Sequence, residues 1–237
     1  MNRETVIAEA LDLLDEVGLD AVSTRQLAKR LGVEQPSLYW HFGNKKELLG
    51  AMAEAAMAPH ATAPLPEPGD DWREWFLENT RSFRRTLLLR RDGARLHAGS
   101  SPGPADLGRV ARKMAFLAAA GLPEQPARMA MLAASRFTVG SVLEEQAAAG
   151  GAAGPAGAAS ASGARGTAGS GGAGGSGGAA GAAGSGGAAG AGGSGGAAGT
   201  GRSSDIPSIV PSIDHDEAFE AGLALIADGL ALAAGQR

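Results

Sequence analysis

The chain of 237 residues contains no cysteine, and aromatic residues make up only 4% of it. The absence of cysteine excludes disulfides, thiol catalysis and zinc sites built on thiolates. No apolar run is long enough to cross a bilayer, and the first residues lack the charged-then-apolar pattern of a signal segment. These absences lead us to expect a cytoplasmic protein without membrane spans.

The chain also lacks an excess of positive charge, because the net charge is −4 and the sequence pI is about 5.6. Between Ser23 and Lys46, however, Glu34 is the only acid. Five cations occupy the same stretch: Arg25, Lys29, Arg30, Lys45 and Lys46. An acidic chain with one local basic surface argues against nonspecific nucleic-acid binding over the whole protein. It favours one defined contact with nucleic acid instead.

This stretch, STRQLAKRLGVEQPSLYWHFGNKK, contains two short helix patterns around a tight turn. Ser23 and Gln26 form a capping-box pattern, which predicts the start of the first helix. Gly32 predicts its end, because a residue without Cβ takes the left-handed conformation at no steric cost. Pro36 suits the first turn of a second helix, with Gln35 as the N-cap. Together these signals predict a helix-turn-helix.

The second helix, expected to reach about His41, is too short and too polar to be a core element. Its N-terminal end presents Gln35 and Ser37, and in a helix-turn-helix such residues meet base edges in the major groove. Asn44 predicts the N-cap of a further helix, where free amides and Lys45 would bind phosphate. The stretch therefore predicts sequence-specific DNA binding, which would bring the protein to the nucleoid.

The alternative interpretation is a small helical hairpin whose charges are merely solvated. The aromatic residues argue against it, since Tyr39, Trp40, His41 and Phe42 crowd one helix end in a protein with a single tyrosine and three tryptophans. Some of these rings must pack. We expect the others to reach phosphates or thymine methyl groups.

At these residues the chain resembles the tetracycline repressor family. The resemblance covers residues 2–49 and continues in SFRRTLLLRRDGARLH (82–97) and FTVGSVLEEQ (137–146). It implies DNA contacts from nine residues: Thr24, Arg25, Gln35, Pro36, Ser37, Tyr39, Trp40, His41 and Lys45. In the family, the positions of Arg25 and Gln35 read bases, and those of Thr24, Tyr39 and Lys45 hold phosphates.

The resemblance also implies a drug pocket in the C-terminal part of the chain. The corresponding residues are His60, Asn79, Phe83, His97, Ser100, Pro102, Lys113 and Glu144. It further implies Mg²⁺ bound together with the drug, with His97 bonding the metal directly and Glu144 acting through water from the other subunit. Without the resemblance, one His and one distant Glu would be a weak basis for predicting a metal site.

Three pocket positions depart from the family pattern. Ala61 stands where the family has a His, although His60 is adjacent; Lys113 replaces a Gln; and Ser101 replaces an Arg. Each lost hydrogen bond is worth about 1 to 3 kcal/mol. These departures leave open whether the effector is a tetracycline with Mg²⁺ or another drug-like molecule.

Apolar spacing over the rest of the chain predicts an all-α protein. We expect helices at residues 3–17, 44–57, 70 or 71 to 91, 94–97, 105–119, 126–148 and after 216. Residues 59–68 break all periodicity and mark a boundary. We assign residues 1–46 to a helix-turn-helix DNA-binding domain and residues 47–237 to a C-terminal effector-binding and dimerisation domain.

Residues 150–202, almost purely Gly, Ala and Ser, interrupt the second domain. No Leu, Ile, Val, Met or aromatic residue lies between Leu143 and Ile206, so ordering this segment would not be repaid by burial. We predict a flexible linker, with partner recruitment as the alternative. Pro207 and Pro211 disfavour the helix that closes the pocket in the family.

The C-terminal helix carries an apolar stripe, which by itself fits internal core as well as an interface. Because helix-turn-helix proteins usually pair two half-sites, and the resemblance implies the same, we expect a homodimer built as a four-helix bundle from this helix and the one at 126–148. The sequence thus predicts a repressor that binds a palindromic operator as a dimer and is released by a small molecule. A regulator with a degenerate, uncontrolled pocket is the alternative. An enzyme using His97 and Glu144 is disfavoured, because no nucleophile motif, phosphate loop or cofactor fingerprint is present.

Overall fold

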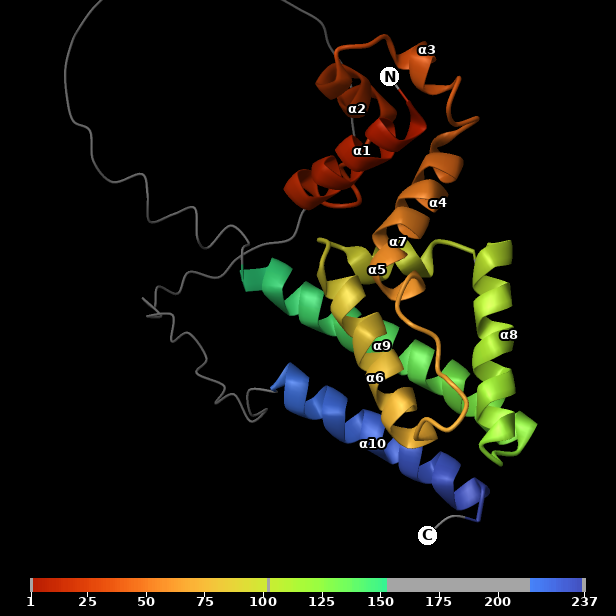
Figure 1. Cartoon of the computed structure of the whole chain (residues 1–237). Coiled ribbons are helices and arrows are strands. Elements are labelled where there is room, and N and C mark those ends of the chain that lie inside the picture. Colours follow the sequence, from red (N-terminus) through yellow and green to blue (C-terminus); the bar gives the residue numbers. More distant parts are fainter. Residues whose placement is uncertain (1, 102, 153–213, 236–237) are drawn as a thin grey trace, which may run out of the picture. The chain divides into compact units, whose positions relative to one another are not determined.

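The computed structural model describes residues 2–101, 103–152 and 214–235, which all belong to one compact unit (Figure 1). These residues form ten helices and no strand, so the predicted all-α class is confirmed. No helix among them combines the length and the apolar character that a membrane crossing requires.

Four helices build the N-terminal part: α1 (Arg3–Val17), α2 (Thr24–Leu31), α3 (Gln35–Leu38) and α4 (Lys45–Ala56). Their apolar faces share one buried cluster, which includes Val6, Ala10, Leu14, Val22, Leu27, Leu38, Phe42, Leu48 and Met52. Helices this short are marginal alone, so the shared core holds them together.

The helix ends are capped largely as the sequence predicts. Ser23 Oγ accepts from the Gln26 amide at 3.2 Å, and Gly32 adopts the left-handed conformation with φ 67°. In a standard capping box the Gln26 side chain would bond the Ser23 backbone amide. Here Gln26 Oε1 instead accepts from the Ser23 hydroxyl at 2.9 Å. Asn44 Oδ1 accepts from the Glu47 amide at 2.9 Å and caps α4.

The third helix is shorter than predicted, and its N-cap is Glu34, not Gln35. It ends at Leu38 instead of about His41. After Leu38 the chain continues as a tight turn, with the Tyr39 and His41 amides donating to the carbonyls three residues before them, at 3.1 Å and 3.0 Å. Leu38 and Phe42, on either side of this turn, are both almost inaccessible to solvent.

Six helices form the rest of the described chain: α5 (Ala58–Ala61), α6 (Trp72–Leu88), α7 (Gly93–Ala98), α8 (Pro104–Ala119), α9 (Glu124–Ala152) and α10 (His215–Ala233). The short α5 lies in the segment that we expected to lack all periodicity. The sixth helix ends at Leu88, before the predicted Arg91. Asp92, the residue before α7, takes a left-handed conformation with φ 55°. The ninth runs to Ala152, past its predicted end, and the remainder of the expected linker lies outside the described residues.

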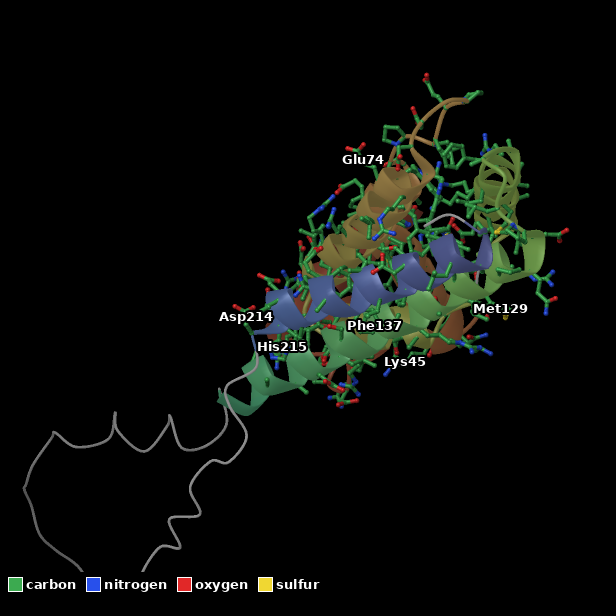
Figure 2. The ribbon with its side chains drawn as sticks, turned by 90° about the horizontal axis from the view of Figure 1, so that it is seen from below. Lys45, Glu74, Met129, Phe137, Asp214 and His215 are labelled. Carbon is green, nitrogen blue, oxygen red and sulfur yellow. The ribbon has the colours of Figure 1, made fainter. Side chains whose placement is uncertain are left out.

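Helices α9 and α10 run side by side, with α6 packed against both (Figures 1 and 2). Phe137 of α9 stacks on Phe219 of α10, with ring centroids 5.5 Å apart. A Cβ on Gly222 would lie 2.4 Å from Phe137 Cζ, so glycine admits this ring. Arg84 of α6 joins the set through ion pairs to Glu145 at 2.7 Å and Asp216 at 2.6 Å.

The turn from α6 to α7 is tied to the N-terminal helices by polar bonds. Asp15 of α1 pairs with Arg90 at 2.5 Å, and Asp92 Oδ2 accepts from the Leu19 amide at 2.8 Å. Leu96 of α7 is buried in the core cluster of the N-terminal helices. A movement of α7 would therefore displace side chains that contact α1 and α4.

Candidate functional site

The predicted DNA-reading end is organised around Gln35. Its Nε2 donates to Thr24 Oγ1 at 3.0 Å and reaches the Tyr39 hydroxyl at 3.4 Å, so the start of α2 is joined to α3. Beside this bridge, Tyr39 is 49% exposed and Trp40 is 89% exposed. Trp40 therefore buries little of its apolar surface against the described part of the chain.

Most of the other predicted DNA contacts are also accessible. Arg25, Pro36 and Lys45 are exposed, and Ser37 and His41 are partly exposed. The structure thus brings all nine predicted residues to the α2–α3 region and the start of α4.

One cation that we counted in the basic surface is used internally. Arg30 pairs with Glu9 at 2.8 Å and Glu16 at 2.6 Å, so it braces α2 against α1. The remaining four cations of the stretch, Arg25, Lys29, Lys45 and Lys46, are exposed.

The predicted pocket residues gather from α5, α6 and α8. Lys113 Nζ donates to Asn79 Oδ1 at 2.6 Å and lies 3.5 Å from His60 Nε2. The other ring nitrogen, His60 Nδ1, is 3.1 Å from Ser82 Oγ. Burial, together with the charge of Lys113, lowers the pKa of His60 to about 4, so His60 is neutral at pH 7.

Phe83 connects this group to the residue expected to bind metal. Its ring lies 5.4 Å from the His60 ring and 5.1 Å from the His97 ring. Burial lowers the pKa of His97 and keeps its imidazole neutral, and its Nδ1 is buried without a hydrogen-bond partner among the described residues. Ser100 Oγ donates to the His97 carbonyl at 2.7 Å.

His97 also lines a narrow crevice between the ends of α4, α6 and α7. Met57, which follows α4, and Thr86 of α6 line the same crevice. The imidazole therefore connects the pocket with the helix that leads to the DNA-reading end.

Two predicted residues are not brought into this group. Glu144 is exposed on α9 and makes no hydrogen bond or ion pair with His97 in the described chain. Pro102 lies outside the described residues. Within the part of the chain that is described, no group of three or more His, Asp or Glu side chains could hold a metal ion.

Sequence reasoning missed two residues beside Lys113. Ser82 contacts His60, as given above, and Arg109 donates to the Ala63 carbonyl at 2.7 Å. Arg109 lies four residues before Lys113 on α8, so helical spacing could have found it. Ser82 follows Asn79 by three residues and could have been found in the same way.

A helix-turn-helix followed by a larger helical body is the architecture of a class of DNA-binding transcriptional regulators. Residues 6–52 match the family model of bacterial regulatory proteins, tetR family, and residues 65–162 match that of the tetracyclin repressor-like C-terminal domain. The chain belongs to the TetR family, whose members are transcriptional regulators and not enzymes.

Individual relatives agree with this assignment. The chain is 53% identical to the tetracycline repressor protein class A of transposon 1721 from Escherichia coli, over 60% of this chain and 66% of that protein. The matched part thus spans about two thirds of that relative's length.

Solved structures extend the likeness over nearly the whole chain. The match to the structure of TetR class A in complex with 5a,6-anhydrotetracycline and magnesium covers 96% of each chain, with 36% identity and a TM-score of 0.65. A TetR-family regulator from Streptomyces coelicolor is 79% identical over 62% of this chain and 86% of its own, with a TM-score of 0.60.

Proposed function

We propose that the protein is a repressor that binds a palindromic operator as a homodimer and is released by a small-molecule effector. The observation that carries this proposal is the cluster of His60, Asn79, Phe83 and Lys113, which adjoins His97 on α7. Because α7 packs against α4, a ligand in this cluster can act on the DNA-reading end. A repressor of this kind works where the DNA is, in the cytoplasm.

For the DNA contact, we propose that Gln35 and Arg25 read bases and that Thr24, Tyr39 and Lys45 hold phosphates. Gln35→Ala should then lower the preference for the operator over random DNA. Lys45→Ala should weaken binding to both DNAs and reduce the slope of log K against log salt by about one. Equal losses on operator and random DNA for both variants would contradict this division.

For the dimer, we propose that α9 and α10 supply the interface. Leu225 and Leu232 of α10 are 72% and 66% exposed, and they lie seven residues apart on one face. Met129 and Leu132 of α9 are also exposed. Covering this apolar surface with a second copy would form a four-helix bundle. Light scattering at micromolar protein should give twice the chain mass, and a monomer mass would contradict the interface.

For the effector, one residue of the site suits Mg²⁺, because His97 keeps a neutral imidazole whose buried Nδ1 has no hydrogen-bond partner among the described residues. Bound Mg²⁺ would supply a Lewis acid that holds chelating oxygens of a drug. We propose His97 as its direct ligand, with Glu144 of a second copy acting through water. Lys113 does not favour this arrangement, since a buried ammonium repels a second cation.

The effector proposal is tested by titrating a complex of the protein and fluorescent upstream DNA with anhydrotetracycline, with Mg²⁺ or with a chelator. Release that needs Mg²⁺ would support the metal-bound drug as the effector. Release without the metal would support the pocket as the effector site and would contradict the role of His97 as a metal ligand.

The second candidate function is a DNA-binding regulator whose pocket is not controlled by a small molecule. The bond from Lys113 to Asn79 favours it, because these polar groups already satisfy each other. Under this alternative, no drug-like compound would release the complex, and replacing Lys113 would change stability without changing any ligand response.

A further inference from the structure

Lys113 is a buried cation without a counter-charge. Its side chain belongs to a residue that is only 8% exposed, and its bonding partners, Asn79 and His60, are both uncharged at neutral pH. No ion pair of Lys113 occurs among the described residues. Burying an unpaired charge is costly, so such groups are normally paired.

A second cation strengthens the positive field at this place. Arg109 lies one helical turn before Lys113, bonds only the Ala63 carbonyl, and forms no ion pair in the described part of the chain. The carboxylate of Asp106, on the same helix, accepts from the Gly103 amide and acts on His97 instead. Two basic side chains therefore share a partly buried site that lacks an acidic one.

The lysine remains largely protonated despite its burial. Desolvation, with a smaller effect from Arg109, lowers the pKa of Lys113 to about 8. At pH 7 the ammonium form still predominates, so Lys113 is a charged group that lacks a negatively charged partner.

We propose that Lys113 and Arg109 form an anion-binding subsite and that the effector is a small aromatic molecule carrying an acidic oxygen. The anion takes the place of Asn79 as the partner of Lys113 Nζ, and the ring system lies against Phe83. This inference rests on the proposed function, because it names the chemical class of the effector for the same pocket. It also makes Lys113 a specificity-determining residue that favours anionic ligands over uncharged ones.

The test compares two fluorescent probes with the same ring system, the anion anilinonaphthalenesulfonate and uncharged N-phenylnaphthylamine. Their dissociation constants are measured with the full chain and with Lys113→Met, which keeps an unbranched side chain of similar length without the charge. Arg112→Met is the matched control, because Arg112 is an exposed cation on the same helix. Lys113→Gln serves as a second variant should Lys113→Met fold poorly, as judged by thermal melting.

We expect the wild-type protein to bind the sulfonate more tightly than the uncharged probe. Loss of one charge-assisted bond should weaken sulfonate binding in Lys113→Met by about tenfold to a hundredfold. Arg112→Met should match the wild type, and all variants should bind the uncharged probe equally. Sulfonate binding that is unchanged in Lys113→Met, or a wild-type protein without preference for the anion, would overturn the proposal.

Operator binding is measured on the same samples, so that failure of the anion-binding subsite and failure of the proposed repressor function can be told apart. Lys113→Met should still bind the operator, since Lys113 is remote from the DNA-reading residues in sequence and in contacts. If none of the proteins binds upstream DNA, the repressor function fails while the probe result still decides the subsite.

Discussion

Replacing Gly93 with alanine tests whether α7 is held as closely against α6 as the structure indicates. Gly93 is buried at the first position of α7, and its φ is ordinary for any residue, so the substitution adds no backbone strain of its own. A Cβ at this position would lie 2.2 Å from the Leu87 carbonyl oxygen. The obstacle is backbone, which cannot rotate away as a side chain can.

The expected cost follows from this distance. Real Cβ atoms essentially never come within 3.0 Å of another heavy atom, so the two segments must separate by almost 1 Å. Overpacking of this kind costs about 1 to 3 kcal/mol. Separation would also disturb the bonds from Gln146 Nε2 to the Leu87 and Arg90 carbonyls, at 3.3 Å and 2.9 Å. We therefore expect a loss of about 3 kcal/mol, at the upper end of that range.

The assay is urea unfolding followed by circular dichroism. Gly108→Ala is the control, because Gly108 lies inside α8 with nothing within 4 Å of its built Cβ. Alanine there should stabilise the helix by up to about 1 kcal/mol. If Gly93→Ala unfolds at the same urea concentration as the wild type, the close approach of α7 to α6 is wrong.

Two further predictions concern stability. Asn44→Ala removes the N-cap of α4 and should lower the free energy of unfolding by about 1 kcal/mol, measured in the same urea assay. An unchanged free energy would show that the cap is dispensable. His60 has a folded pKa of about 4. An unfolded His titrates near pH 6.5, so between pH 6.5 and 4 the unfolded chain binds a proton that the folded protein does not. The free energy of unfolding should therefore fall by up to about 3 kcal/mol as the pH is lowered from 6.5 towards 4. His60→Gln should have a flatter pH profile, and identical profiles would contradict the buried, neutral state.

The sequence predicts the helices where local signals and apolar spacing agree. The first helix matches its predicted bounds, because Asn2 caps it and Gly18 ends it. The third helix was predicted too long, because Pro36 marks a start but nothing local marks the end. In the structure the helix gives way at Leu38 to a turn with bonds between residues three apart, at Tyr39 and His41.

The pocket residues are predicted only through the resemblance, and the chemistry of the pocket depends on contacts between distant segments. Nothing local reveals that Lys113 reaches Asn79, 34 residues earlier, or that Phe83 lies between two imidazoles. Arg30 illustrates the opposite error. It was counted as free basic surface, whereas pairing with Glu9 and Glu16 of α1 removes it from that role.

Footprinting of the protein on its own upstream DNA tests the central claim most directly. A repressor dimer of this kind should protect two half-sites whose centres lie about 34 to 36 Å apart, or a multiple of that distance. Gln35→Ala should lose this protection at concentrations where the wild type retains it. A protein that protects no defined site up to micromolar concentration, or protects a single half-site as a monomer, would contradict the account.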